Sequence, residues 1–342
     1  MSIRSDAFSP RVTGLAFLVL AAIWGAAFVA IEIGLHHFPP LTFAGLRYLL
    51  AGAIVLGYAR LTTEYVLPRN RRDLLRIAVL AVFFIFGNHA FLYLAEQYVS
   101  GAIAAVVVSF SPVLTAVFAS LVLGDASLGR RELVGFIAGI AGVVIIAQPT
   151  PDSFAVANLL GIGLVFVAAV SFALGAVLSH PIPTTIPLAS LQGWSMLTGA
   201  TMLVIGGRLR GEAIAAIEPT PTAVLSFVYL TFVSGAFAFL LYFTLLDQVG
   251  PARLNLVGYL EPVAATLVGW ALLGELVGPA TVAGFGFILL GFALVNAESI
   301  SSRFGVAVPT GAGIRRFLTR RYFVAGVASG HDDDLLRGHR RG

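Results

Sequence analysis

The sequence of 342 residues contains no cysteine and no lysine. Without cysteine the chain can form no disulfide, no cysteine-ligated zinc site and no thiol nucleophile. Without lysine it can hold neither a P-loop lysine nor a lysine Schiff base, which argues against transport driven by its own ATP hydrolysis. The HExxH and GxSxG motifs of metalloproteases and serine hydrolases are also absent. We therefore expect no enzyme and no cofactor.

Charged residues are scarce as well, at 11% of the chain, while 58% of the residues are hydrophobic. A soluble domain carries roughly a quarter charged residues, because its surface must meet water. Most of the exterior of this protein must therefore face lipid. We expect an all-α, multi-pass protein of the cell inner (plasma) membrane, with the lipid bilayer and a small molecule as its partners and no nucleic acid.

Apolar runs of the length that a bilayer requires, about 20 residues, recur along the chain. Turn-forming clusters rich in proline, glycine and polar residues separate them. They predict ten transmembrane helices, near residues 12–35, 40–60, 73–97, 99–123, 131–148, 156–179, 187–207, 220–247, 250–274 and 278–297.

The distribution of arginine predicts the orientation, since short loops rich in arginine stay in the cytoplasm. Arginines cluster in the loop after the second predicted helix, in the loop after the fourth and in the basic tail 298–342. With ten helices all of these lie on the same side as the N-terminal segment 1–11. Only Arg208 and Arg210 fall on the other side, so we expect both termini to be cytoplasmic.

The two halves of the chain, 12–148 and 149–297, resemble each other. AAIWGAAF at 21–28 aligns with AAVSFALG at 168–175, and LRYLLAGA at 46–53 aligns with GWSMLTGA at 193–200. Each half holds five predicted helices, and because five is odd the second copy enters the membrane in the opposite sense. The sequence thus predicts two inverted five-helix repeats, an arrangement that secondary transporters use for alternating access.

These repeats, together with Trp24-Gly25 in the first helix, Arg47 in the second and a Gly-acid step after the fourth and ninth, resemble the drug/metabolite transporter superfamily. The resemblance is to its EamA-type exporters, over about residues 12–297, with the bacterial aromatic amino-acid exporters as the most similar branch. It implies ten helices, cytoplasmic termini and a central cavity lined by helices one to four and six to nine. The second repeat departs from the first, with Trp194 in place of Arg47, so the halves should contribute unequally to the site.

Polar groups inside the predicted helices are the first candidates for the substrate site, because burying them in lipid is costly. Glu261 lies near mid-membrane, directly before Pro262. It could bind a substrate ammonium group, titrate during the cycle, or be a protonated packing partner of a neighbouring helix. Asn88, His89 and Tyr93 lie together in the third helix, and the spacing of His89, Tyr93 and Glu96 places these three on one face.

Aromatic residues complete the candidate substrate-binding set. Trp24 and Phe28, at i and i+4, face the same way and lead towards Glu32, while Trp194 and Tyr259 offer matching surfaces in the second repeat. An aromatic amino acid needs apolar area for its ring and a few polar groups for its zwitterion. Each aromatic could instead face lipid. Arg47 could bind a substrate carboxylate, pair with an acid or extend towards the membrane surface.

The sequence therefore favours a secondary exporter of small organic solutes, amino acids first and aromatic ones above all, that works by alternating access around a midplane cavity. A multidrug or other metabolite exporter of the same superfamily is the alternative. A channel is disfavoured, because no recurring ring of carbonyls or charges marks a selectivity filter.

Overall fold

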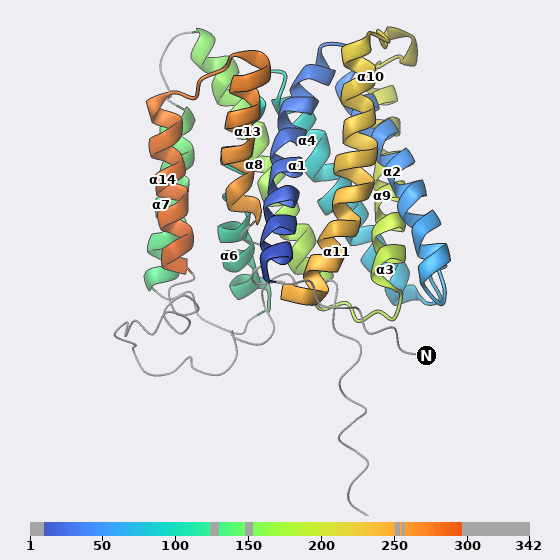
Figure 1. Cartoon of the computed structure of the whole chain (residues 1–342). Coiled ribbons are helices and arrows are strands. Elements are labelled where there is room, and N and C mark those ends of the chain that lie inside the picture. The colour runs from blue at the N-terminus through green and yellow to red at the C-terminus, as the bar shows by residue number, and fades with distance from the viewer. Residues whose placement is uncertain (1–9, 124–129, 148–152, 250–253, 255–256, 296–342) are drawn as a thin grey trace, which may run out of the picture.

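The computed structural model describes residues 10–123, 130–147, 153–249, 254 and 257–295. Every regular element in this part of the chain is a helix. Figure 1 shows a bundle in which the helices run between two common ends, and the start of α1 and the end of α14 lie at the same, lower end. The elements of the first half are α1 Pro10–Leu35, α2 Pro40–Thr62, α3 Arg71–Val79, η1 Leu80–Gly87, α4 Asn88–Ala95, α5 Gly101–Val108, α6 Ser111–Leu123 and α7 Arg130–Ala147. Those of the second half are α8 Ser153–Ser179, α9 Leu188–Leu209, η2 Ile214–Ala216, α10 Pro221–Val228, η3 Tyr229–Phe237, α11 Ala238–Val249, α13 Val257–Leu273 and α14 Pro279–Val295.

Seven of the ten predicted transmembrane helices are confirmed as long and apolar enough to cross a bilayer. They are Val12–Leu35, Pro40–Thr62, Arg71–Ala95, Gly101–Val122, Val156–Ser179, Leu188–Leu209 and Pro221–Tyr242. The other three predicted helices correspond to the shorter apolar helices Leu133–Ala147, Val257–Leu273 and Pro279–Val295. The segments 1–9 and 298–342, with the predicted basic tail, lie outside the described residues, so the count of ten and the orientation stay predictions.

The third helix of each half contains a π-helical segment. α3, η1 and α4 follow one another without a break, and so do α10, η3 and α11. The segments η1 and η3 occupy nearly the same place in their halves, since Leu80 and Leu230 are 150 residues apart. π-Helical turns are rare and occur mostly as short insertions at functional sites. Their presence in both halves indicates a feature of the repeat itself.

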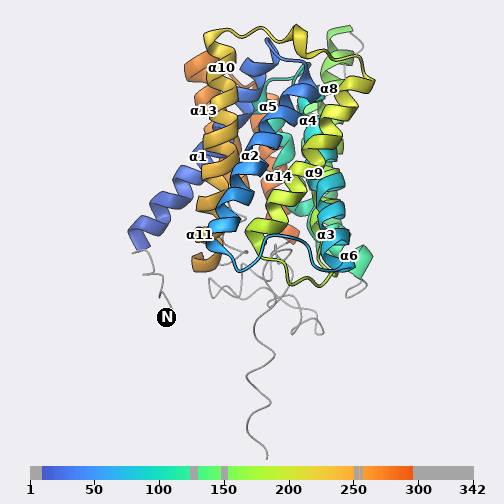
Figure 2. The ribbon, with the colours of Figure 1, turned by 90° about the vertical axis from the view of Figure 1, so that its right-hand side faces the viewer.

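The main contacts between the two halves are symmetric: each has a counterpart in which the halves take each other's place. The two most extensive contacts join equivalent helices, α2 with α9 and α7 with α14; Figures 1 and 2 both show α2 and α9 side by side. The first helix of one half packs on the fourth of the other, as α1 does on α13 and α8 on α6, and α2 contacts η3 as α9 contacts η1. The two halves therefore interlock and do not form separate bodies.

Glycines allow the closest of these contacts. A Cβ atom on Gly25 of α1 would lie 2.5 Å from both the Ala264 side chain and the Glu261 carbonyl oxygen of α13. A Cβ atom on Gly284 of α14 would lie 2.6 Å from the Gly142 carbonyl oxygen of α7. Small residues let membrane helices approach at this distance, where van der Waals contact stabilises the pair.

Candidate functional site

The polar residues predicted in the third helix converge on a buried cluster around His89. The Tyr48 hydroxyl lies 2.5 Å from His89 Nε2, and His89 Nδ1 lies 2.8 Å from the Ile85 carbonyl oxygen. The carbonyl can only accept, so Nδ1 carries the hydrogen and Nε2 of the neutral ring accepts from Tyr48. Both ring nitrogens are thus occupied, and His89 orients Tyr48 without a free position for a solute.

Arg47 is the buried cation of this cluster. Its guanidinium carbon lies 4.1 Å from the centre of the Tyr48 ring and 5.5 Å from that of Tyr93. Nη1 donates to the Leu230 carbonyl oxygen of η3 at 3.3 Å, while Nε has no hydrogen-bond partner among the described residues. Of the three roles open from sequence, pairing with an acid is not what the structure has, since within the described residues no carboxylate lies within 4.0 Å of Arg47.

Three further side chains of this region hold polar atoms that are buried and unpaired. The Tyr93 hydroxyl, Asn88 Oδ1 and both carboxylate oxygens of Glu96 lack a hydrogen-bond partner among the described residues. Leaving a buried polar group unpaired costs roughly 1–3 kcal/mol, and more for a charged group. Tyr93 interacts electrostatically with Arg47 and with Glu96, so these groups form one region. They are candidates for receiving the polar groups of a solute.

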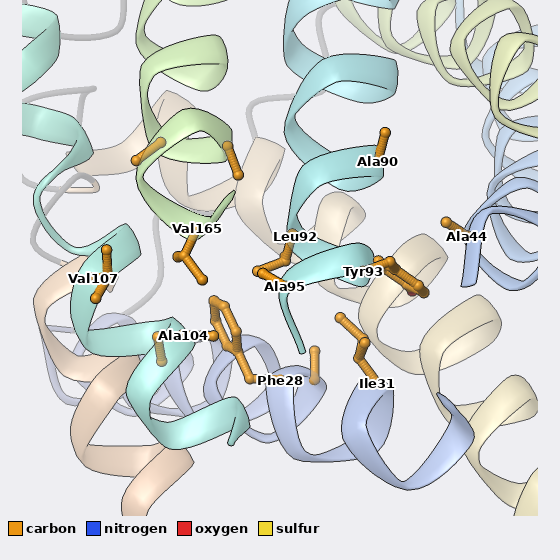
Figure 3. Packing of buried hydrophobic residues seen from close by; sticks show 14 of the residues in the cluster. Phe28, Ile31, Ala44, Ala90, Leu92, Tyr93, Ala95, Ala104, Val107 and Val165 are labelled. Carbon is orange, nitrogen blue, oxygen red and sulfur yellow. The ribbon is translucent and has the colours of Figure 1, made fainter. Parts of the chain in front are cut away.

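Trp24 and Phe28 point to different neighbours of α1. The indole N–H of Trp24 donates to the Ser234 carbonyl oxygen of η3 at 3.3 Å, and its ring lies 5.5 Å from that of Tyr242. Phe28 is buried; Figure 3 shows its ring beside Ala104 of α5. The predicted aromatic face of α1 therefore lies inside the protein and not against lipid.

Tyr259 and Glu261 lie on α13, which packs against α1. The Tyr259 ring is 4.3 Å from that of Phe292 on α14, and its hydroxyl is buried without a partner in the described part of the chain. Glu261 is half-buried. Pro262, inside the helix, leaves one carbonyl of the preceding turn without its helical donor. Glu261 therefore lies beside a locally irregular turn of α13 with part of its surface exposed.

Trp194 lies away from the Arg47 cluster. Its indole N–H donates to the Val66 carbonyl oxygen at 2.9 Å, in the connection between α2 and α3, and its side chain packs against the buried cluster of Ile77, Leu80, Ile186 and Leu191. Trp194 occupies the position in the second repeat that Arg47 occupies in the first, but the two residues make different contacts. Arg47 holds a π-helical segment and Trp194 holds a loop.

Sequence reasoning missed the residues whose role depends on distant partners. In the sequence Glu275 is only the acid of the Gly-acid step after the ninth predicted helix. In the structure Gly274 follows α13 with a φ of 72°, and Glu275 lines a cavity and interacts with Glu32. The backbone N–H of Gly101 donates to Glu32 Oε2 at 2.7 Å. Nothing local in the sequence predicts these contacts, because each joins residues far apart in the chain.

Comparison with known proteins identifies the family of this chain. The EamA-like transporter family matches residues 12–148 and 159–297. The "Uncharacterized inner membrane transporter YedA" of Escherichia coli (strain K12) is 30% identical over 283 residues, which cover 82% of this chain and 89% of the relative. The "Probable amino-acid metabolite efflux pump" of Salmonella typhimurium is 27% identical over 291 residues, covering 82% of this chain and 93% of the relative.

A crystal structure of a protein that is 21% identical shares the fold, with a TM-score of 0.59 over 86% of this chain and 99% of that one. The family match covers both predicted repeats and begins and ends at their outer limits, residues 12 and 297. The predicted resemblance to EamA-type proteins is therefore confirmed. This chain belongs to the EamA-like transporter family and is a multi-pass membrane transporter.

Proposed function

We propose that the protein is a secondary exporter of amino acids, aromatic ones first. The observation that carries the proposal is a basic and an acidic side chain that are buried in one region and hold polar atoms without hydrogen-bond partners among the described residues. Arg47 Nε and both oxygens of Glu96 are unpaired among the described residues, and the two groups interact electrostatically. An amino acid carries the complementary pair, a carboxylate for Arg47 and an ammonium group for Glu96.

The aromatic surroundings support a ring as the side chain of the substrate. Tyr93 packs edge-on against Phe43 with 5.5 Å between ring centres, and Phe43 stacks on Phe38 at 4.5 Å. Aromatic pairs of this geometry are each worth about 0.5–1.5 kcal/mol beyond the area that they bury. A substrate ring that enters this cluster can replace one such contact by another at little net cost.

The predicted site residues divide into roles under this proposal. Asn88 and Tyr93 contact the polar end of the substrate, and His89 positions Tyr48 beneath Arg47. Trp24, Phe28, Tyr259 and Glu261 lie on α1 and α13, which pack against each other, and contact the substrate when the cycle opens that packing. Substrate binding by Trp194 stays a prediction, because its indole contacts the loop between α2 and α3.

The transport cycle in this proposal is alternating access by two inverted five-helix repeats, 12–148 and 149–297, in the plasma membrane with both termini cytoplasmic. The contact of α1 with α13 and the equivalent contact of α8 with α6 support this cycle. A rocking motion can tighten one of these two contacts while it loosens the other. The name of the Salmonella relative, a probable amino-acid metabolite efflux pump, agrees with the substrate class.

The test is uptake of labelled tryptophan into proteoliposomes that contain the purified chain. We expect transport that phenylalanine and tyrosine compete for and cationic dyes do not. Arg47→Gln and Glu96→Gln should each raise the KM for tryptophan about tenfold or more, because each removes one charge-assisted contact worth about 1.5–3 kcal/mol. Glu261→Gln should lower transport as well, while Glu64→Gln, an exposed carboxylate, should leave it unchanged. Dye movement without amino-acid movement would instead establish a multidrug exporter.

A further inference from the structure

Three carboxyl groups meet at the end of the bundle opposite the start of α1. Glu32 lies in the last turns of α1, Glu96 follows α4, and Glu275 follows α13. Glu32 interacts electrostatically with both Glu275 and Glu96. These elements are distant in the chain, so the fold brings the three acids together.

Glu32 is fixed in place by the start of α5. Its Oε2 accepts the backbone N–H of Gly101 at 2.7 Å, which leaves the rest of the carboxyl group for Glu275. Gly101 itself sits against the backbone of Phe28, where a Cβ atom would lie 2.6 Å from the Phe28 carbonyl carbon. Two carboxylates held at this range repel strongly unless a proton lies between them.

Glu96 is a second, independent sign that positive charge is required here. Its side chain is only 5% exposed, and neither oxygen has a hydrogen-bond partner among the described residues. Arg47, the nearest cation, is occupied by the Leu230 carbonyl and by two aromatic rings. A buried carboxylate without a partner costs several kcal/mol. Three acids and one guanidinium thus leave this region short of positive charge.

A cavity that opens to the surface reaches one of these acids, Glu275. Glu275 lines a half-open cavity of about 220 Å³ together with Ser100, Ile103, Leu276, Val277 and Gly278. Glu275 Oε2 is buried without a hydrogen-bond partner in the described part of the chain, whereas the next residue, Leu276, is 82% exposed. Water entering from this end therefore reaches Glu275 without crossing the bundle.

We propose that Glu32 and Glu275 form a proton-binding site that loads from the outer compartment through this cavity, and that its proton is the coupling ion of the transporter. Loading is a simple transfer from hydronium to a carboxylate, and the proton then lies in the hydrogen bond between the two groups. The groups that face the pair are the Gly101 N–H and Glu96, and Glu96 in turn faces Arg47 and Tyr93.

The electrostatic interaction between Glu32 and Glu96 couples proton binding to substrate binding. A proton on Glu32 or Glu275 lowers the negative charge that attracts a substrate ammonium group to Glu96, and by the same coupling the bound ammonium group favours loss of that proton. Proton and substrate therefore compete electrostatically, as an antiporter requires. This coupling depends on the proposed amino-acid site, whereas proton binding by the pair does not.

The first test measures coupling in proteoliposomes whose lumen is about one pH unit more acidic than the medium. With the membrane potential clamped at zero by a potassium ionophore and equal potassium on both sides, a one-to-one antiporter then accumulates tryptophan about tenfold, the ratio that one pH unit sustains. We expect Glu275→Gln and Glu32→Gln to abolish this accumulation and to keep tryptophan exchange without a gradient. Glu218→Gln is the matched control, because that carboxylate lies before α10, at the same end, and its side chain is 73% exposed. Unchanged accumulation in both variants would overturn the proposal.

The second test needs no substrate. A hydrophobic carbodiimide modifies protonated carboxyl groups, and peptide mass mapping of the purified full chain locates the adduct. We expect labelling of Glu32 or Glu275 that declines as the pH rises, and none of Glu218. Such labelling in a protein that transports no amino acid would refute the proposed function and support the proton site. Tryptophan transport without any labelling of the pair would refute the proton site alone.

Discussion

At the scale of single residues, the start of α2 depends on a carboxylate from the other half of the chain. Glu212 accepts hydrogen bonds from the backbone N–H groups of Leu41, at 3.1 Å, and Thr42, at 2.7 Å, and from the Thr42 hydroxyl at 2.8 Å. The first N–H groups of a helix have no partner within the helix, and its N-terminus favours negative charge. Glu212 supplies both requirements across 170 residues of sequence.

Glu212→Ala should therefore lower the free energy of unfolding by about 1–2 kcal/mol, the usual cost of losing a helix cap. Equilibrium unfolding in mixed detergent micelles measures the change. The control is Glu64→Ala, which removes an exposed carboxylate at the other end of α2. Equal losses in the two variants would show that the cap contributes nothing specific.

At the scale of elements, the two π-helical segments are held by the first helix of the opposite half. Trp24 of α1 donates to the Ser234 carbonyl oxygen in η3, and Ser171 of α8 donates to the Phe83 carbonyl oxygen in η1 at 2.8 Å. Trp24 and Ser171 are equivalent positions, 147 residues apart, in the aligned repeats. Different side chains thus perform the same task, which is to satisfy a carbonyl in a segment with irregular helical hydrogen bonding.

Removing either bond should loosen one π-helical segment and leave the other unchanged. We expect Trp24→Phe to speed amide hydrogen exchange in η3, and Ser171→Ala to speed it in η1, each by about fivefold for a bond worth about 1 kcal/mol. Hydrogen exchange with mass spectrometry resolves the two peptides, so each variant is the control for the other. Faster exchange in both segments in either variant would contradict independent anchoring.

Hydropathy predicted the helices because the length and apolarity of each lipid-facing run are local properties of the sequence. It could not predict η1 and η3, since the same residues satisfy an α-helical and a π-helical pattern equally well.

The contacts of the candidate site residues could be predicted only in part, for a related reason. Tyr93 and Asn88 are buried with unpaired polar atoms, while the partner of His89 is Tyr48, on a helix that periodicity cannot align with it. Glu275 required knowledge of α1, more than 240 residues earlier in the chain.

At the scale of the whole molecule, the number of crossings decides how the two halves work together. The inverted arrangement requires α7, α13 and α14 to cross the membrane, although these are the shorter apolar helices. The extensive contact between α7 and α14, with Gly142 and Gly284 at its closest point, gives both helices a partner along their length. A pair packed in this way buries its polar backbone and is suited to the membrane as one unit.

The absence of cysteine makes the crossing number directly measurable, because single cysteines can be introduced into the natural chain. With ten crossings, Arg71→Cys lies in the cytoplasm while Glu218→Cys and Leu276→Cys lie outside. With only the seven longer helices crossing, Glu218→Cys would follow an even number of crossings and lie in the cytoplasm, while Leu276→Cys would stay outside. An impermeant maleimide added to whole cells should therefore label Glu218→Cys and Leu276→Cys and spare Arg71→Cys until the cells are lysed. Protection of Glu218→Cys in intact cells, with Leu276→Cys still labelled, would show that α7 does not cross and would remove the inverted repeat on which alternating access depends.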